Sequence, residues 1–287
     1  MEDSFSVRIK IETSNKALKN RLARQTALCG LLLSQGEGDL TVPPSEVKIP
    51  ERLSELVLQL FELENVGCSY ARGKIMFENI ESSVIWELSK KLIADIEGSR
   101  LSTDDARRFL RGSFWGSGYC SDPKKSYRIE FAVQKERAAS LISAALYALS
   151  IKHICSERDG SFAVYFKNGD DVSDFLGYIG SITERLEFEN IRAGKDINGK
   201  VFRTMNCDEA NSKRQAEAAA SRNELINKVI RSGKVNKLSP ELQEAAKAHM
   251  ENPGASIAEL GAMMNPPIGK SGMRHRLDKI AEFAKDL

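Results

Sequence analysis

Apolar residues recur at helical spacing in some stretches of the chain and alternate with polar residues in others. Residues 53–63 place six apolar residues on one helical face, and the Pro-Glu pair at 50–51 provides a favourable helix start. Similar periodicity predicts helices over residues 82–96, 136–150 and 170–182. These segments therefore account for four amphipathic helices.

Alternation of apolar and polar residues predicts the strands. Residues 127–133 alternate as a strand does, and short runs on either side of residues 72–73 and 158–160 form the arms of two predicted hairpins. Residues 5–11 also alternate and predict either a half-buried strand or an amino-terminal extension. The turn-rich residues 37–44 predict another strand or the start of a hairpin.

Two further helices, predicted over residues 16–35 and 103–118, contain glycines. Each has a leucine two residues before a glycine and a second glycine six residues later: Leu28, Gly30 and Gly36, then Leu110, Gly112 and Gly118. A glycine inside a helix costs about 1 kcal/mol relative to alanine, which indicates close backbone approach to a neighbour. The copies lie 82 residues apart, so we interpret them as an internal repeat.

This repeated pattern resembles the paired helices of LAGLIDADG homing endonucleases. The resemblance implies a pseudo-two-fold αββαββα repeat over about residues 16–185, in which the two glycine helices pack together. In that family each helix delivers a carboxylate just before its final glycine, and Gln35 and Ser117 stand at those positions here. Neither is an anionic ligand for Mg²⁺, and Glu37 lies beyond the helix end. We therefore expect the fold without its catalytic acids.

The following segment is polar. Glycines and charges in residues 186–206 predict a linker, and the alanine-rich residues 206–232 predict a long helix. A polar helix of this kind bridges domains in solvent, or its basic residues contact phosphates. The second possibility involves Lys213, Arg214, Arg222, Lys228 and Arg231.

The last fifty residues have the pattern of a helix-turn-helix domain. Ser239-Pro240 opens a helix to about residue 251, and Ser256 with Glu259 forms a capping box for a second helix. A third helix begins at about Lys270, and its predicted buried stripe is Met273, Leu277, Ile280, Ala281 and Ala284. Two short helices joined by a tight turn, with basic residues around the start of the next helix, are typical of DNA-binding modules.

The start of the third helix supplies the candidate DNA contacts. A recognition helix presents its first turns to base edges, where arginine bonds guanine. We expect Arg274 to contact a base, Ser271 and His275 to lie near bases, and Lys270 and Arg276 to contact phosphates. Lys213 and Arg214 are further candidates. The alternative is that these charges form only the solvated face of a packed three-helix domain.

The run from Ser256 to Ile280, together with the degenerate LAGLIDADG-like part, resembles the bacterial WhiA regulators over nearly the whole chain. The resemblance implies a transcription regulator of sporulation or cell division that binds promoter DNA mainly through its helix-turn-helix. We expect an α+β fold with a LAGLIDADG-like domain over residues 1–190, a linker and bridging helix over 191–235, and a separate all-α domain over 236–287. RNA polymerase or another regulator is a candidate second partner, and we expect a monomer.

Composition adds little beyond this. Residues 200–287 hold 15 Lys and Arg against 11 Asp and Glu, while residues 1–199 hold 27 against 29, so a polyanion partner fits the carboxy-terminal part. The five cysteines are scattered and never in C-x-x-C spacing, which predicts reduced thiols in a cytoplasmic, nucleoid-associated protein. The three histidines lie far apart, so we predict no metal and no cofactor. An active endonuclease and a protein- or ligand-binding scaffold are the alternative functions for the first domain.

Overall fold

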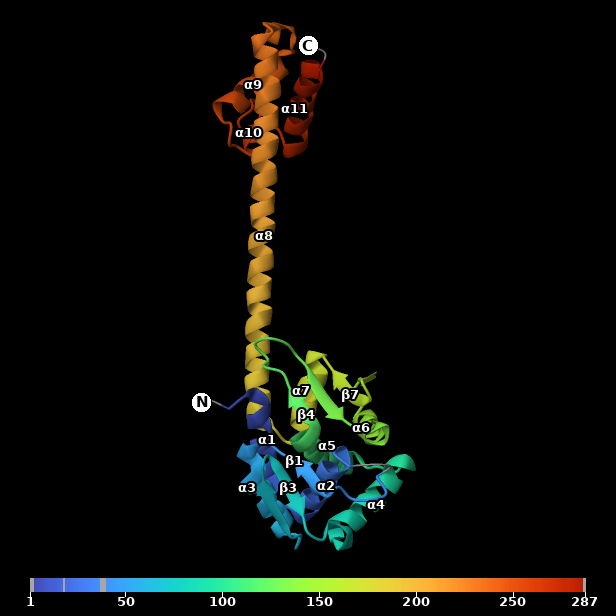
Figure 1. Ribbon diagram of the computed structural model, residues 1–287. Helices are drawn as coiled ribbons and strands as arrows, with labels where there is room; N and C mark the ends of the chain where they lie inside the picture. Colours follow the sequence, from blue (N-terminus) through green and yellow to red (C-terminus); the bar gives the residue numbers. More distant parts are fainter. Residues whose placement is uncertain (1–2, 18, 37–39, 286–287) are drawn as a thin grey trace. The chain divides into compact units, whose positions relative to one another are not determined.

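The computed structural model describes residues 3–17, 19–36 and 40–285. The chain forms two compact units, Met1–Lys195 and Asp196–Leu287. The first unit is a mixed α/β structure with two similar halves, and the second is built of helices alone among its described residues (Figure 1).

The first half of the first unit surrounds a three-stranded antiparallel sheet with the strand order β1-β3-β2. Its elements are α1 (Phe5–Ala17), α2 (Arg21–Ser34), β1 (Glu46–Lys48), α3 (Glu51–Glu62), β2 (Cys68–Ala71), β3 (Lys74–Phe77), η1 (Ile80–Ser82) and α4 (Val84–Glu97). The β2–β3 hairpin turns at Arg72 and Gly73, both with positive φ, as the sequence predicts.

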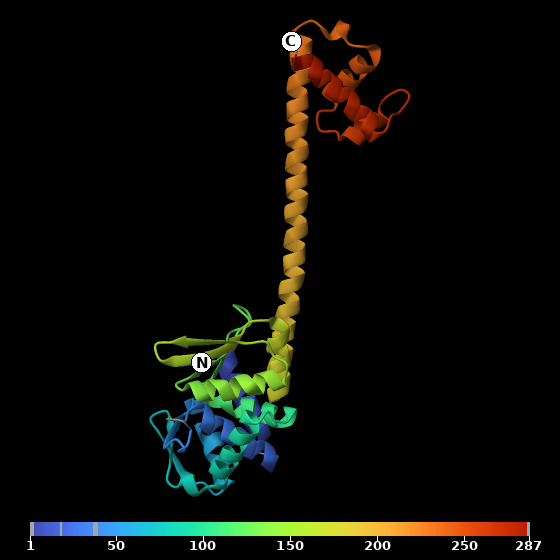
Figure 2. The same ribbon diagram turned by 90° about the vertical axis from the view of Figure 1, so that its right-hand side faces the viewer.

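The second half has a four-stranded sheet in the order β4-β5-β7-β6. Its elements are α5 (Thr103–Ser117), β4 (Gly118–Cys120), β5 (Ile129–Val133), α6 (Glu136–Ala148), β6 (Ile154–Arg158), β7 (Ser161–Phe166) and α7 (Gly169–Ile179). Helix α6 lies along one face of this sheet (Figure 2). Strand β4 follows α5 directly. The equivalent stretch after α2 includes Glu37 and Gly38, which lie outside the described residues.

The glycine helices pack against each other as predicted. A Cβ built on Gly112 would lie 1.6 Å from the carbonyl oxygen of Ala27, and one on Gly30 would lie 2.1 Å from that of Phe109. Real Cβ atoms do not approach so closely, so α2 and α5 meet at this distance only because both positions are glycine. Ser113 Oγ adds a hydrogen bond of 3.2 Å to the Gly30 carbonyl across the contact. Because α2 belongs to the first half and α5 to the second, their contact joins the two halves of the unit.

The prediction for residues 5–11 is wrong, because this segment is part of helix α1. Phe5, Ile9, Thr13 and Ala17 are all buried on one face at four-residue spacing. A short run of alternating residues contains apolar positions that also fit a helix, and packing against the rest of the unit selects the helix here. The predicted helix over 16–35 likewise begins only at Arg21, where the Asn20 side chain accepts a hydrogen bond from the Ala23 N–H as an N-cap.

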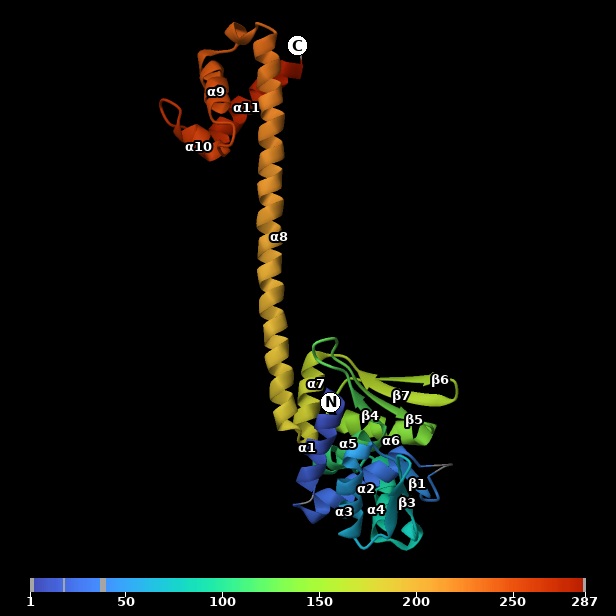
Figure 3. The same ribbon diagram turned by 60° about the vertical axis from the view of Figure 1, so that its left-hand side comes forward.

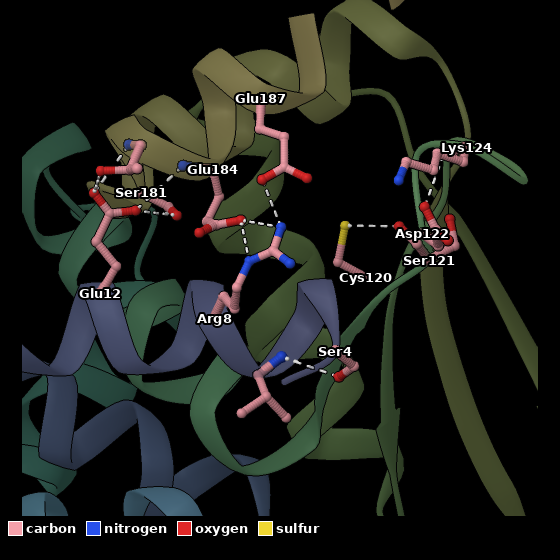
Figure 4. Close-up of polar contacts among 12 residues, drawn as sticks. Ser4, Arg8, Glu12, Cys120, Ser121, Asp122, Lys124, Ser181, Glu184 and Glu187 are labelled. Carbon is pink, nitrogen blue, oxygen red and sulfur yellow. Dashed lines mark hydrogen bonds and ion pairs between the residues drawn. The ribbon is translucent and has the colours of Figure 1, made fainter. Parts of the chain in front are cut away.

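Helix α8 (Ile182–Arg231) starts in the first unit, and its first turn is fixed to helix α1. Glu12 of α1 accepts hydrogen bonds from the hydroxyls of Ser181 and Thr183 and from the Thr183 N–H, all at 2.8–3.0 Å. Arg8 donates to Glu184 at 2.9 Å and to Glu187 at 2.6 Å (Figure 4). An acidic side chain at a helix amino terminus satisfies otherwise unpaired N–H groups.

The expected linker over residues 186–206 is not observed, because α8 runs through it as one continuous helix. Gly194 and Gly199, two of the glycines that predict the linker, are helical. Glycine lowers helix stability without forbidding a helix, so composition alone misjudged this segment. Most residues between 201 and 220 are exposed, as a polar helix requires.

The second unit contains the end of α8, η2 (Val235–Lys237), α9 (Pro240–Glu251), α10 (Ile257–Ala262) and α11 (Lys270–Lys285). Helices α9, α10 and α11 gather beside the last part of α8 (Figure 3). The predicted stripe of α11 is buried at Met273, Leu277, Ile280 and Ala284, while Ala281 is only half-buried. The α8 residues Ile226 and Val229 belong to the same core. The unit therefore needs the end of α8 to complete its hydrophobic core.

Candidate nucleic-acid interface

The two positions that would carry catalytic acids serve the fold instead. Gln35 caps the end of α2, and its side-chain amide makes two hydrogen bonds to Lys48 of strand β1. It donates to the Lys48 carbonyl at 2.8 Å and accepts from the Lys48 N–H at 2.7 Å. The same side chain lies over Gly116 of α5. The Gln35 side-chain amide therefore bonds the backbone of β1 much as a neighbouring strand would.

Ser117 at the end of α5 has a purely local contact. Its hydroxyl donates to the Ser113 carbonyl of its own helix at 2.8 Å. Across the described part of the chain, no three His, Cys, Asp or Glu side chains come together as a group that could hold a metal ion. Within the described residues, the ends of α2 and α5 therefore supply no set of carboxylate ligands for a divalent cation.

The predicted DNA-contacting residues do come together at the start of α11. Lys270, Ser271, Arg274 and His275 are exposed in its first two turns, opposite the buried Met273 and Leu277. Among the described residues, neither Lys270 nor Arg274 takes part in an ion pair. The capping box at α10 is present as predicted, with Ser256 accepting from the Glu259 N–H and Glu259 accepting from the Ser256 N–H.

Arg276 differs from its neighbours. Its side chain is only 19% exposed, and its guanidinium lies 3.7 Å from the Glu244 carboxylate of α9. Glu244 in turn accepts a hydrogen bond from the Asn265 N–H in the turn between α10 and α11. Arg276, expected at a phosphate, therefore contributes to packing between α9 and α11.

The α8 candidates lie in the same unit. Lys213 and Arg214 are exposed, and Arg214 lines a groove of about 650 Å³ between α8, the loop before α10 and the start of α11. Arg222, Lys270 and Arg274 line the same groove. Arg222 appears in the sequence only as one of several basic residues of a polar helix. Its spacing of eight residues from Arg214, two helical turns, is the one sequence signal that places both on one side of α8.

Sequence comparison identifies the two parts of the chain separately. The family model of the WhiA LAGLIDADG-like domain matches residues 106–198, and that of the WhiA C-terminal HTH domain matches residues 201–284. None of the described helices is both long enough and apolar enough to cross a membrane.

Relatives in clostridia are also named WhiA. A "Probable cell division protein WhiA" of Clostridium tetani is 32% identical over 74% of this chain and 65% of its own length. That of Clostridium beijerinckii is 37% identical over 64% of this chain and 58% of its own length. The chain thus spans less than two thirds of these relatives.

The fold has a counterpart among solved structures. The crystal structure of full-length DUF199/WhiA from Thermotoga maritima matches with a TM-score of 0.61 and 23% identity, covering 99% of both chains. This likeness concerns the fold, an amino-terminal LAGLIDADG domain followed by a helix-turn-helix domain. Together with the two domain matches and the named relatives, it leads to one assignment: the chain belongs to the WhiA family.

Proposed function

We propose that this protein is a sequence-specific DNA-binding regulator that contacts promoter DNA through the start of α11 and has no nuclease activity. The observation that carries the proposal is the exposed cluster of Lys270, Ser271, Arg274 and His275 on the first turns of a helix whose other face is buried. Exposed cations without carboxylate partners at this position of a helix-turn-helix are suited to a duplex.

Within this proposal the residues have different tasks. Arg274 contacts a base edge in the major groove, with Ser271 and His275 near neighbouring bases. Lys270, Lys213 and Arg214 contact phosphates, which position the helix without reading sequence. Because the relatives are named probable cell division proteins, we extend that role to this chain and propose that its target promoters serve cell division.

The proposed absence of nuclease activity depends on the two helix ends. Gln35 is bonded to strand β1 and Ser117 to its own helix, and neither of these two side chains is a carboxylate. A LAGLIDADG-type endonuclease is the rival function, since the first unit has that fold. It would need two acids that the described helix ends do not supply.

One experiment tests both parts. The full chain is incubated with a library of random duplexes and with promoter-derived duplexes, over a salt series with Mg²⁺ present. We expect selective enrichment of one sequence, an affinity that falls steeply with salt, and intact DNA. Cleavage or nicking by a pure preparation would establish the rival function, and an absence of sequence enrichment would contradict the regulator proposal.

A further inference from the structure

The groove between α8 and α11 is lined by four cations. Arg214 and Arg222 come from α8, and Lys270 and Arg274 come from α11. The other described lining residues are small, apolar or uncharged, and none is acidic. A concave surface with one sign of charge concentrates the field and favours an anion.

Arg222 is the least solvent-exposed of these four cations. Its side chain is half-buried, and its Nε is enclosed without a hydrogen-bond partner among the described residues. Burial first, and then the neighbouring Arg274, lower the pKa of Arg222, while Asp278 acts in the opposite direction. The guanidinium is thus partly desolvated beside a like charge, a costly arrangement that a bound anion would relieve.

The α8 wall of the groove is made mainly of small side chains. Between the arginines, Ala216, Ala218 and Ala220 line it together with the uncharged Gln215, so most of this stretch lets a ligand approach the helix surface. Arg214 and Arg222 are separated by eight residues, or about 12 Å along the axis. This alanine-rich stretch has few apolar residues to bury, and yet it presents two cations beside the proposed recognition helix. Its composition fits a surface that a sugar–phosphate backbone can approach.

We propose that Arg214 and Arg222 of α8, with Lys270 across the groove, hold a phosphodiester group of the duplex next to the base contact of Arg274. This inference rests on the function proposed above and adds Arg222, and a groove shared with α11, to the α8 contacts. Arginine suits the task because its planar guanidinium bonds two phosphate oxygens at once. The DNA-binding module then begins near residue 212 rather than at residue 236, because α8 supplies both its core residues Ile226 and Val229 and its phosphate contacts.

The test uses the whole 287-residue chain and two duplexes, one enriched by selection and one of random sequence. Arg214→Ala and Arg222→Ala should each weaken binding to both duplexes equally, by roughly three- to tenfold, because a phosphate carries no sequence information. Each should lower the slope of log affinity against log salt by about 0.9 if one phosphate contact is lost. Arg214 is exposed, so its substitution keeps the test valid even if Arg222→Ala disturbs folding.

Lys279→Ala is the control. Lys279 is an exposed cation of α11, nine residues after Lys270 and therefore on the opposite side of that helix. Affinity losses as large for Lys279→Ala as for Arg214→Ala would overturn the groove assignment, and so would unchanged binding by both groove variants. If wild-type protein binds neither duplex, the proposed function itself fails, and the two failures are thereby distinguished.

A second arm separates DNA from a free nucleotide as the source of the phosphate. ATP and inorganic phosphate are added to the DNA complex at constant ionic strength. The proposal expects displacement no greater than that caused by an equivalent amount of chloride. Selective displacement by ATP, lost in Arg222→Ala, would assign the groove to a nucleotide and overturn the assignment to the DNA backbone.

Discussion

The charges of the two units are arranged in opposite ways. In the first unit, Glu64 has a 1% exposed side chain and accepts from Arg24 at 2.6 Å and from Gln25 at 2.7 Å. Arg8 and Glu12 likewise have partners at the start of α8. In the second unit, Lys270 and Arg274 have no ion-pair partner among the described residues.

This difference supports the proposed location of the DNA contact. Buried charges must be compensated inside the protein, because removing one partner leaves the other desolvated. Exposed cations without a partner are compensated by counterions, which DNA phosphates displace. The buried Glu64 of the first unit thus has internal partners, whereas the exposed Lys270 and Arg274 of the second have none among the described residues, as the proposed DNA contact requires. The following predictions test the two sides of this comparison, beginning with the largest expected effect.

Gly112→Ala should destabilise the first unit strongly. The added Cβ would lie 1.6 Å from the Ala27 carbonyl oxygen, so α2 and α5 would have to separate. We expect a loss of more than about 3 kcal/mol, well above the gain of about 1 kcal/mol in helix propensity. Trp86 and Trp115 both lie in this unit, so urea unfolding followed by tryptophan fluorescence reports on it alone.

The control for this substitution is Gly194→Ala in the first-unit part of α8. Its Cβ would have no atom within 4 Å, so the variant should be as stable as wild type or slightly more stable. Equal stability of the Gly112 and Gly194 variants would show that the glycine contact is unimportant for joining the halves.

Lys10 of the first unit is a buried cation that takes part in no ion pair among the described residues. It is buried, its ammonium lies 5.5 Å from the centre of the Phe114 ring, and burial lowers its pKa to about 8 from the ordinary 10.5. Between pH 8 and 10.5 the unfolded chain still binds the proton that the folded chain has released. The unfolded state then holds more protons, so the Lys10 contribution to stability rises with pH over this window, by roughly 3 kcal/mol.

Lys10→Met removes this contribution. The variant should be more stable than wild type near pH 7, where the wild-type protein buries a charged lysine. The difference should shrink as pH rises from 8 to 10.5, because wild-type Lys10 becomes neutral in the folded state. Urea unfolding at several pH values measures this difference, and exposed Lys91→Met serves as the control. A difference that stays constant with pH would exclude a burial-shifted Lys10.

Arg274→Ala should weaken DNA binding by the second unit without changing the stability of that unit. We expect a loss of about 1–3 kcal/mol in binding free energy, together with relaxed preference at one base pair. Arg276→Ala should instead mainly lower the free energy of unfolding of the second unit, because Arg276 pairs with Glu244. A binding selection on both variants checks this. An unaltered base preference in Arg274→Ala would remove it from the base-reading face.

The sequence predicted the elements that carry strong local signals. The glycine spacing predicted the α2–α5 contact, and the Ser256–Glu259 pair predicted the start of α10. It failed where tertiary packing decides the outcome. Residues 5–11 fit either a strand or a helix, and the helix is chosen by contacts with distant parts of the unit. The continuous α8 was missed because Gly194 and Gly199 suggested a linker, although neither residue prevents a helix.

Part of the candidate site could also be predicted from the sequence, and part depended on tertiary packing. The first turns of α11 could be read from the sequence because a buried stripe fixes which side is exposed. The pairing of Arg276 with Glu244 could not, since it depends on how α9 packs against α11. The groove between α8 and α11 also required the structure, because its two walls are distant in the sequence. Arg222 on α8 and Lys270 on α11 are 48 residues apart.

The smallest predicted effect compares the two helix ends of the first unit. Gln35→Ala removes two hydrogen bonds to Lys48 and should cost about 1 kcal/mol, because these bonds are near the surface. Ser117→Ala removes a bond to a carbonyl of its own helix and should change the tryptophan-detected unfolding midpoint little. Neither substitution should alter DNA affinity, since neither position touches the proposed interface. If Gln35→Ala instead abolished DNA binding while the unit stayed folded, the helix ends would still take part in DNA recognition. The division of tasks between the two units would then be wrong.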